Sequence, residues 1–406
     1  MTIRSWSQPA ISNMDTDFVS SGGEDLTKTP AVLAFGKRRL LDLTVWTIIV
    51  IISPSTQSLV ARAAVPLYHF ETSVKFSSET LKISARHQQQ SPKPPGRLVD
   101  LGGHRLHVNC TGKGAPTVVV ETGLGDFSFD WFLVQSEISR VTRICTYDRA
   151  GYAWSDPGPK PRTFAQLNLE LRDALSKLGE QAPFLLVGHS YGGPVVRNFA
   201  LTYPQLVAGI VFVDSAFEGQ RVGVGGRMLI RLGEGAKHLK IPTPREDMKP
   251  SDKVTFPPNL PSPNLTLDRM YSVLPADQQQ WHIWAQSQPQ LDDAENSQRE
   301  WSDEYFANWL SKSQDGVLGP IPVLVLMRAN GGYQDGEYEI AAAQLESERR
   351  EGQGKLLRLS QNSRQVMLLS GHNMELEAPD QVVAAIRMVL TAIREKKNLR
   401  AADKRN

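Results

Sequence analysis

Short apolar runs alternate with amphipathic segments along most of the chain. Runs rich in β-branched residues cover 117–123, 143–149, 184–190, 209–215, 322–328 and 365–371. Continuous apolar runs of this length are typical of strands buried on both faces of a sheet. Between most of these runs apolar residues recur at helical spacing, most clearly over 163–179 and 378–397. This alternation predicts an α/β fold with a parallel sheet covered by helices on both faces, preceded by a hairpin over 97–110.

The alternation of predicted strands and helices is interrupted once, between Phe217 and Pro320. Residues 241–264 are crowded with proline and predict a loop, whereas the stretch after them predicts helices. These helices carry four tryptophans, Trp281, Trp284, Trp301 and Trp309. We interpret the insertion as a helical lid with the tryptophans on its inner surface. The alternative is that they pack only the core of the lid itself.

The first ninety or so residues differ from the rest. Residues 1–39 are polar and predict a disordered tail, and the basic stretch 37–39 precedes an apolar run from Leu40 to Ile52. This run is shorter than the roughly 20 residues of a spanning helix and contains Asp42. We favour a signal anchor or a cleaved signal peptide over a plain buried helix. The protein would then be anchored at a membrane or exported, although a cytoplasmic location stays open.

Five segments follow from these patterns. Residues 1–92 hold the tail, the hydrophobic signal or anchor segment and a linker, and residues 93–216 form the first half of the core. The insertion covers 217–318, the second half of the core covers 319–397, and a basic tail covers 398–406.

The net charge and the two cysteines say little about which partners the protein binds or in which cell compartment it lies. The formal net charge of +2 gives no electrostatic basis for binding nucleic acid. The two cysteines, Cys110 and Cys145, lie in or at the end of predicted strands. They are either small buried apolar residues or, in an exported protein, a disulfide.

One strand-to-helix turn at the edge of the predicted sheet carries a candidate catalytic serine. In "LVGHSYGG" (residues 186–193), Ser190 lies where a buried strand passes into a helix. A corner that tight leaves no room for side chains at Gly188 and Gly192, and it holds the serine hydroxyl clear of the backbone. The alternative is an ordinary turn made of small residues. The presence or absence of other catalytic groups in the sequence distinguishes the two interpretations.

A serine nucleophile needs a base and donors for the oxyanion. Of the eight histidines, only His372 follows a late core strand, in a loop that begins with Gly371. The Gly-rich turn "ETGLG" follows another strand, and the backbone amides of Leu124 and Tyr191 are the natural oxyanion donors.

From Pro95 to about Lys396 the chain resembles the α/β-hydrolase superfamily, in its esterase-like branch. The resemblance rests on stretches in the family's order, "ETGLG", "RICTYDRAGYAWSDPGP", "LVGHSYGG", "GIVFVDS" and "SGHNMELEAP". It implies an eight-stranded, mostly parallel sheet, a helical lid inserted after strand six, and a Ser-acid-His triad without a metal or other cofactor. In such a protein Asp148 and Arg149 are expected to brace a loop.

The function implied is a serine hydrolase that cleaves carboxylic esters of apolar small molecules or lipids. An acyltransferase and a non-catalytic receptor of the same fold are the alternatives. Dehalogenases and epoxide hydrolases of the superfamily use Asp at the corner, and Ser190 excludes that chemistry here.

Two carboxylates compete for the role of orienting His372. Asp335 follows strand seven at a distance, past the loop "ANGGYQ", and would also suit a helix N-cap. Asp214 ends strand six, at the sheet edge where Ser190 is expected. We favour Asp214, because capping already accounts for Asp335.

Overall fold

The computed structural model describes residues 34–40, 43–49, 91–224, 228–237, 240–245, 267–329 and 331–399. These residues belong to two units, residues 1–77 and 78–406, and each is described by itself. The predicted tail before residue 34, residues 50–90, the proline-rich segment 246–266 and the basic end after residue 399 lie outside the described residues.

The first unit contains an antiparallel pair of strands, β1 (Ala34–Leu40) and β2 (Leu43–Ile49). The sequence predicts a disordered tail followed by a helical signal, anchor or buried segment here, so the extended backbone is a difference from that expectation. Five of the seven residues of β2 are β-branched, and such residues favour strands over helices. Among the described residues, no helix is both long and apolar enough to cross a membrane.

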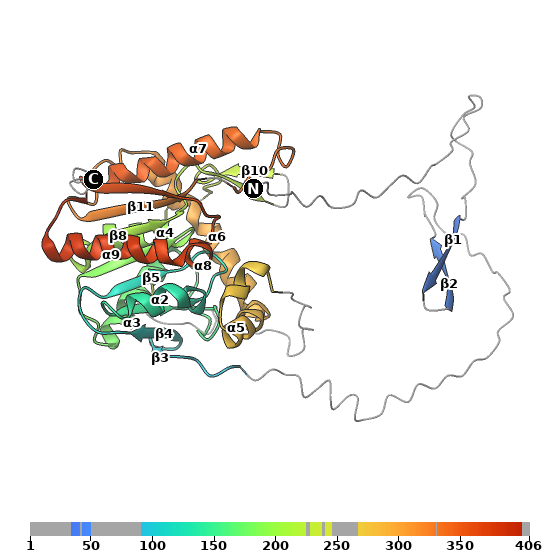
Figure 1. Cartoon of the computed structure of the whole chain (residues 1–406), viewed down its shortest axis with the longest axis horizontal. Helices are drawn as coiled ribbons and strands as arrows, with labels where there is room; N and C mark the ends of the chain where they lie inside the picture. Colours follow the sequence, from blue (N-terminus) through green and yellow to red (C-terminus); the bar gives the residue numbers. More distant parts are fainter. Residues whose placement is uncertain are drawn as a thin grey trace, which may run out of the picture. The chain divides into compact units, whose positions relative to one another are not determined.

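An eight-stranded sheet forms the centre of the second unit, in the order β12-β11-β8-β7-β5-β6-β4-β3 (Figure 1). The bounds of its strands are β3 (Arg97–Asp100), β4 (Arg105–Thr111), β5 (Val118–Glu121), β6 (Ile144–Tyr147), β7 (Phe184–His189), β8 (Val207–Val213), β11 (Pro322–Arg328) and β12 (Asn362–Leu368). Six neighbouring strands from β12 to β6 run parallel, and only β4 and β3 pair antiparallel at one edge. The predicted α/β fold with a mostly parallel sheet is therefore confirmed.

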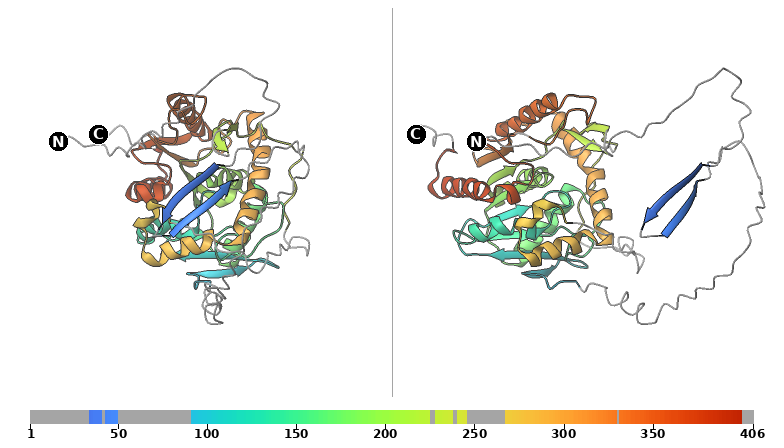
Figure 2. Two further views of the ribbon diagram at one scale, coloured as in Figure 1. Left: turned by 90° about the vertical axis from the view of Figure 1, so that its right-hand side faces the viewer. Right: turned by 45° about the vertical axis from the view of Figure 1, so that its right-hand side comes forward.

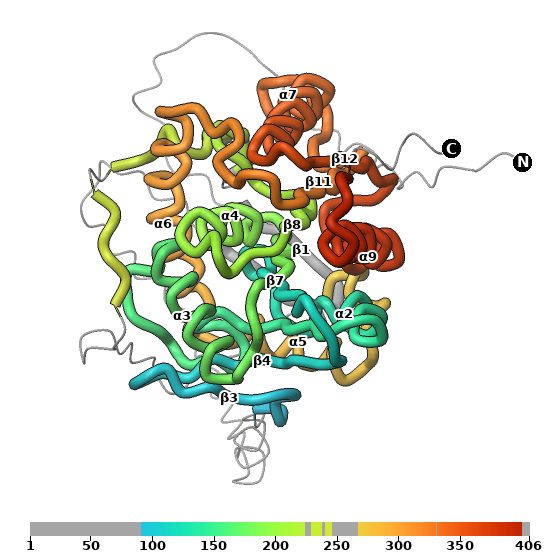
Figure 3. The backbone as a smooth tube through the Cα atoms, turned by 90° about the vertical axis from the view of Figure 1, so that its left-hand side faces the viewer, coloured from blue at the N-terminus to red at the C-terminus, as the bar shows by residue number. Residues whose placement is uncertain are grey.

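Helices cover both faces of this sheet. Figure 3 shows α3 (Phe164–Lys177) and α4 (Gly192–Thr202) on one side, with α2 (Phe132–Ile138) and α9 (Pro379–Glu395) on the other. Helix α7 (Ala342–Lys355) packs against β11, and the short α8 (Met374–Glu377) precedes α9.

The strands supply both faces because successive side chains point in opposite directions. Leu185 joins the buried cluster that contains α2 and α9 residues, and Leu186 joins the cluster that contains α3 and α4 residues. Both side chains are fully buried. This burial on two faces explains why β7 reads as a continuous apolar run rather than an alternating one.

The long insertion lies between β8 and β11, the sixth and seventh strands of the sheet. Its described elements are β9 (Arg221–Val224), β10 (Met228–Arg231), a 3-10 helix over Arg269–Val273, α5 (Ala276–Gln286) and α6 (Pro289–Leu310). Figure 2 shows α5 and α6, in gold and orange, together at one side of the core.

Cys110 and Cys145 form a disulfide. They lie directly opposite each other on the antiparallel strands β4 and β6. Of the two alternatives that the sequence leaves open, the structure contains the cross-linked one.

Candidate active site

Ser190 occupies the corner between β7 and α4. Its backbone has a φ of +49°, in the left-handed region that non-glycine residues rarely adopt. Its amide donates to the Val213 carbonyl at 3.1 Å, and its own carbonyl accepts from the Ala216 amide at 3.0 Å. The strained conformation is therefore held by β8 and the segment after it, as strain at a functional position requires.

The flanking glycines are there because neighbouring chain passes too close for a side chain. A β-carbon on Gly188 would lie 2.7 Å from the Gly192 carbonyl oxygen, and one on Gly192 would overlap the Glu121 and Thr122 carbonyls. Both contacts involve backbone, which cannot move aside cheaply. The structure thus gives the two glycines the steric reason that the sequence pattern suggests.

The three side chains favoured from the sequence meet at this corner. The His372 Nε2 atom lies 2.9 Å from Ser190 Oγ, and His372 Nδ1 lies 2.7 Å from Asp214 Oδ2. The His372 side chain is 42% exposed, whereas Asp214 is buried. An accessible ring whose other nitrogen is hydrogen-bonded to a buried carboxylate is the arrangement in which a histidine can take a proton from a serine.

Asp335 is not part of this group. Its Oδ1 atom accepts a hydrogen bond from the Ala342 amide at 3.1 Å, at the start of α7, and the residue is exposed. The N-cap of α7 is Ala341, so the sequence-based expectation of Asp335 as the N-cap is wrong. Asp335 instead satisfies a free amide at the start of the helix from a position seven residues before it.

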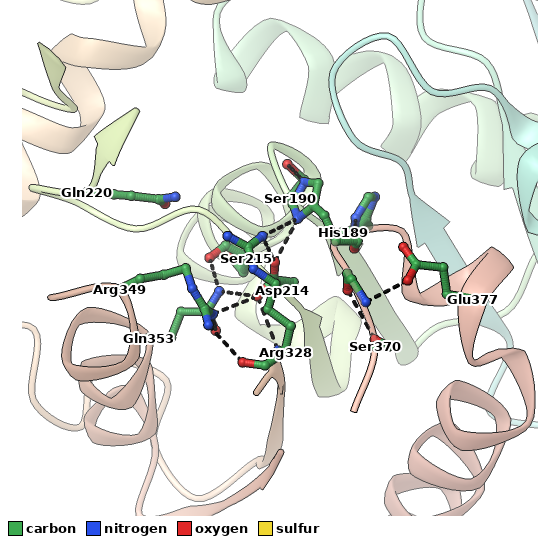
Figure 4. A network of polar contacts seen from close by, with 12 residues as sticks. His189, Ser190, Asp214, Ser215, Gln220, Arg328, Arg349, Gln353, Ser370 and Glu377 are labelled. Carbon is green, nitrogen blue, oxygen red and sulfur yellow. Dashed lines mark hydrogen bonds and ion pairs between the residues drawn. The ribbon is translucent and has the colours of Figure 1, made fainter. Parts of the chain in front are cut away.

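Two arginines and a glutamine surround the Asp214 carboxylate (Figure 4). Arg328 Nη1 donates to Oδ2 at 2.8 Å, Arg349 Nη1 to Oδ1 at 3.2 Å, and Gln353 Nε2 to Oδ1 at 2.9 Å. Burial raises the pKa of Asp214, but the His372 hydrogen bond and the charges of Arg328 and Arg349 hold it well below its usual range. Asp214 is therefore ionised at neutral pH.

Sequence reasoning missed these three partners of Asp214. One sequence feature could have indicated Arg328. No carboxylate comes directly after strand seven, and the residue that ends this strand is Arg328. Because neighbouring parallel strands end at one edge, Arg328 lies beside Asp214 at the end of β8. Arg349 and Gln353 come from α7 and could not be placed without the fold.

The Gly-rich loop after β5 lies next to the turn that carries Ser190, and the Arg149 side chain holds this loop in place. Arg149 donates to the carbonyls of Thr122 at 2.8 Å and of Gly123 at 2.6 Å, and it pairs with Glu121 at 2.7 Å. The Gly123 amide donates to Asp126 Oδ2 at 3.0 Å. Arg149 thus holds the loop, the role expected of it from the sequence.

The side chains of Leu124 and Tyr191 pack in the same apolar cluster, so the two backbone segments that carry the candidate oxyanion donors lie close together. The cluster also contains Tyr305, Phe306 and Trp309 of α6. The insertion is therefore in direct contact with the neighbourhood of Ser190.

Two of the insertion's four tryptophans, Trp284 and Trp309, pack inward. Trp284 is 5% exposed and Trp309 is 4% exposed, and both contact residues of the core, including Trp154 and Phe164. Trp281 is only partly buried and lies 5.2 Å from Trp154, ring centroid to ring centroid. For Trp284 and Trp309 the structure thus favours a packing role over a surface that faces a ligand.

Comparison with known proteins agrees with the fold described above. Residues 118–385 match the alpha/beta hydrolase family. A Hormonema carpetanum protein named "Probable transporter efuK" is 36% identical over 129 residues, which are 30% of this chain and 18% of that protein. An "AB hydrolase superfamily protein" of Gibberella zeae is 26% identical over 299 residues, 69% of this chain and 87% of that protein.

Among solved structures, that of the epoxide hydrolase CorEH is 16% identical with a TM-score of 0.50, and the alignment covers 73% of this chain and 99% of that one. At this identity the likeness concerns the fold alone. The chain spans only 18% of the length of efuK, so the activity of that whole protein is not assigned to this chain.

Proposed function

The chain belongs to the alpha/beta hydrolase family, and from this premise we propose that it is a serine hydrolase acting on carboxylic esters. The proposal rests above all on two distances. Ser190 Oγ lies 2.9 Å from His372 Nε2, and His372 Nδ1 lies 2.7 Å from Asp214 Oδ2. Each member has a defined chemical task, and no further group is needed to complete the set.

In the first half-reaction Ser190 Oγ attacks the ester carbonyl carbon while its proton passes to His372 Nε2. The carbonyl oxygen gains negative charge and accepts hydrogen bonds from the Leu124 and Tyr191 amides. Collapse of this intermediate breaks the bond to the alcohol oxygen, which leaves with the proton from His372. Ser190 then carries the acyl group.

In the second half-reaction water attacks the acyl carbon and gives a proton to His372 Nε2. The new intermediate collapses to a free acid, and the proton returns to Ser190 Oγ. Throughout, Asp214 accepts from His372 Nδ1 and keeps the ring in the tautomer whose Nε2 can take a proton. An alcohol in place of water would give acyl transfer, the alternative activity.

We propose that the insertion acts as a lid that favours esters of apolar small molecules or lipids. Trp281 supports this role, because it is partly buried and its ring contacts Trp154 and Phe129 of the core, and Phe129 follows the Gly-rich loop in the sequence. Replacing Trp281 with Ala should change the preferred acyl-chain length. Leu310→Ala is the matched control, because Leu310 lies on α6 and is 51% exposed. Equal chain-length profiles for both variants would contradict the lid proposal.

A panel of p-nitrophenyl esters, amides and thioesters, with the Ser190→Ala variant as control, tests the activity. We expect short- and medium-chain esters to be cleaved by the wild type and not by the variant. Added alcohols distinguish an acyltransferase, because ester products would then replace free acid. No turnover of any member by folded wild-type protein would contradict the proposal and favour a ligand receptor.

A further inference from the structure

His189, the residue before the proposed nucleophile, has contacts that reach two loops of the candidate site. It ends β7, its side chain is 1% exposed, and both ring nitrogens are engaged. Nδ1 lies 2.9 Å from Asp126 Oδ2, and Nε2 lies 3.0 Å from the backbone carbonyl oxygen of His372. Figure 4 shows His189 directly beside Ser190, at the end of the strand.

Both partners of the ring are acceptors. A carbonyl oxygen never donates, and Asp126 is ionised because the His189 hydrogen bond and nearby positive charges outweigh burial and lower its pKa. A neutral imidazole can donate from one nitrogen only. The ring therefore needs protons on both nitrogens to satisfy both contacts, which makes it a cation.

A second carboxylate faces this cation. Glu375 Oε2 lies 3.9 Å from His189 Nε2, and Glu375 is fully buried with no hydrogen-bond partner for either carboxylate oxygen among the described residues. Burial lowers the pKa of His189, but the charges of Glu375 and Asp126 and the two hydrogen bonds raise it to about 10.

These contacts tie two loops of the site together. Asp126 Oδ2 also accepts from the Gly123 amide at 3.0 Å, one residue before the proposed oxyanion donor Leu124. On the other side of the ring, the carbonyl belongs to the proposed base, whose own ring lies 4.8 Å away, centroid to centroid. One charged side chain thus spans from the Gly-rich loop to the loop of His372.

We propose that His189 is a permanently charged positioning residue that fixes the oxyanion loop relative to the general base. The positioning role rests on the proposed serine hydrolase function, whereas the charge of the ring does not. A displacement of about 1 Å at such a site costs roughly a hundredfold in rate, so a link that spans both loops has a large effect without touching substrate.

A bound cation is the competing interpretation of the cluster. Ligand atoms of Asp126, His189 and Glu375 all lie within 4.8 Å of one another. A metal ion needs a free lone pair on the imidazole, and both nitrogens of His189 already face acceptors. The proton on the ring, rather than a metal, is therefore the positive charge that balances the carboxylates.

Ring ¹⁵N NMR of histidine-labelled wild-type protein tests the charge directly. At pH 8.5 we expect the histidine signal that is missing from His189→Gln to have both ring nitrogens protonated. If that variant does not fold, Asp126→Asn serves instead, because removing the counter-ion should shift the same signal. A neutral His189 ring at pH 8.5 would overturn the proposal whether or not the protein is an esterase.

Kinetics test the positioning role. His189→Gln should lower kcat for a cleaved ester by about 10- to 100-fold with KM changed less than about threefold, since substrate contacts remain. His107→Gln is the matched control, because His107 is equally buried and its ring also contacts a carboxylate, Asp148 at 2.7 Å, and a backbone carbonyl, that of Pro95. The control should keep its kcat.

The outcomes separate the two proposals. An active wild type with an equally active His189→Gln variant would overturn the positioning role and leave the serine hydrolase standing. A wild type that cleaves no ester would contradict the proposed function, and the NMR experiment would still decide the charge of His189.

Discussion

At the scale of single residues, the site is built from side chains whose positions are over-determined. Asp214 has a φ of +36°, which is rare for any residue but glycine, and its carboxylate accepts from His372, Arg328, Arg349 and Gln353. Its geometry is therefore set before any substrate binds. Such preorganisation lowers the barrier to proton transfer between Ser190 and His372, because the surroundings need not reorganise during the reaction.

The choice between the two candidate acids gives a direct prediction. Asp214→Asn should lower kcat by up to about 10⁴-fold, since the amide no longer holds His372 in the tautomer whose Nε2 accepts a proton. Asp335→Asn is the natural control, because Asp335 bonds the start of α7 and is not in the group formed by Ser190, His372 and Asp214. Both variants are compared on one ester after circular dichroism shows that they are folded. A collapse of activity in Asp335→Asn with a nearly silent Asp214→Asn would refute the assignment.

Glu375 gives a prediction on pH and stability. Burial and the nearby Asp126 raise its pKa to about 7, above its ordinary 4.5, and His189 only partly opposes this. A raised pKa in the folded state stabilises the protein below pH 4.5, and this contribution is lost as the pH rises through about 7. We expect the unfolding free energy of wild type, relative to Glu375→Gln, to fall between these pH values. A difference that rises or stays flat across urea titrations in this window would contradict the stated environment of Glu375.

Reading the sequence at this scale recovers the residues that carry a local signature and misses the others. Ser190 stands between the glycines of a tight corner, and His372 follows a late strand, so both positions are marked by their neighbours. Asp126, Arg349 and Gln353 carry no such mark, because their roles depend on which segments the fold brings together. Contacts between distant segments are set by tertiary packing rather than by local pattern.

At the scale of elements, strands buried on two faces were the most predictable. Their apolar runs are continuous, as parallel strands under helices require, and the structure has a strand at each of the six main runs. The first unit differs, because an apolar run of this length suits either a strand or a helix and only its β-branched content favours the strand pair. Packing of Trp284 against the core was also beyond the sequence, which shows helical spacing but not the partner of each helix face.

The disulfide between β4 and β6 gives a prediction at this scale. It closes a loop with a sequence separation of 35, which corresponds to roughly 4 kcal/mol of lost entropy in the unfolded chain. The double variant Cys110→Ala and Cys145→Ala should therefore unfold at lower urea concentration, with ester hydrolysis at 25 °C nearly unchanged. Reducing agent should shift wild type in the same direction and leave the double variant unaffected. Equal stability of both proteins would show that the cross-link contributes little.

At the scale of the whole molecule, location is the property that the chain indicates least directly. We propose that it is exported or anchored at a membrane through its N-terminal segment. The Cys110–Cys145 disulfide supports this proposal, because disulfides persist mainly in oxidising compartments. Cell fractionation of full-length protein tests it, with thiol labelling to report the cysteines. Recovery in the soluble cytosolic fraction with both cysteines reduced would count decisively against export.

The central claim is that Ser190 is an activated nucleophile. Incubation of the folded full-length protein with a fluorophosphonate probe, followed by peptide mass spectrometry, tests it most directly. Attack by Ser190 Oγ on phosphorus with loss of fluoride should leave the phosphonyl adduct on the peptide that contains Ser190, and His372→Ala should label far more slowly because no base takes the serine proton. Folded wild-type protein that carries no adduct on Ser190, or labels no faster than the His372→Ala variant, would contradict the account.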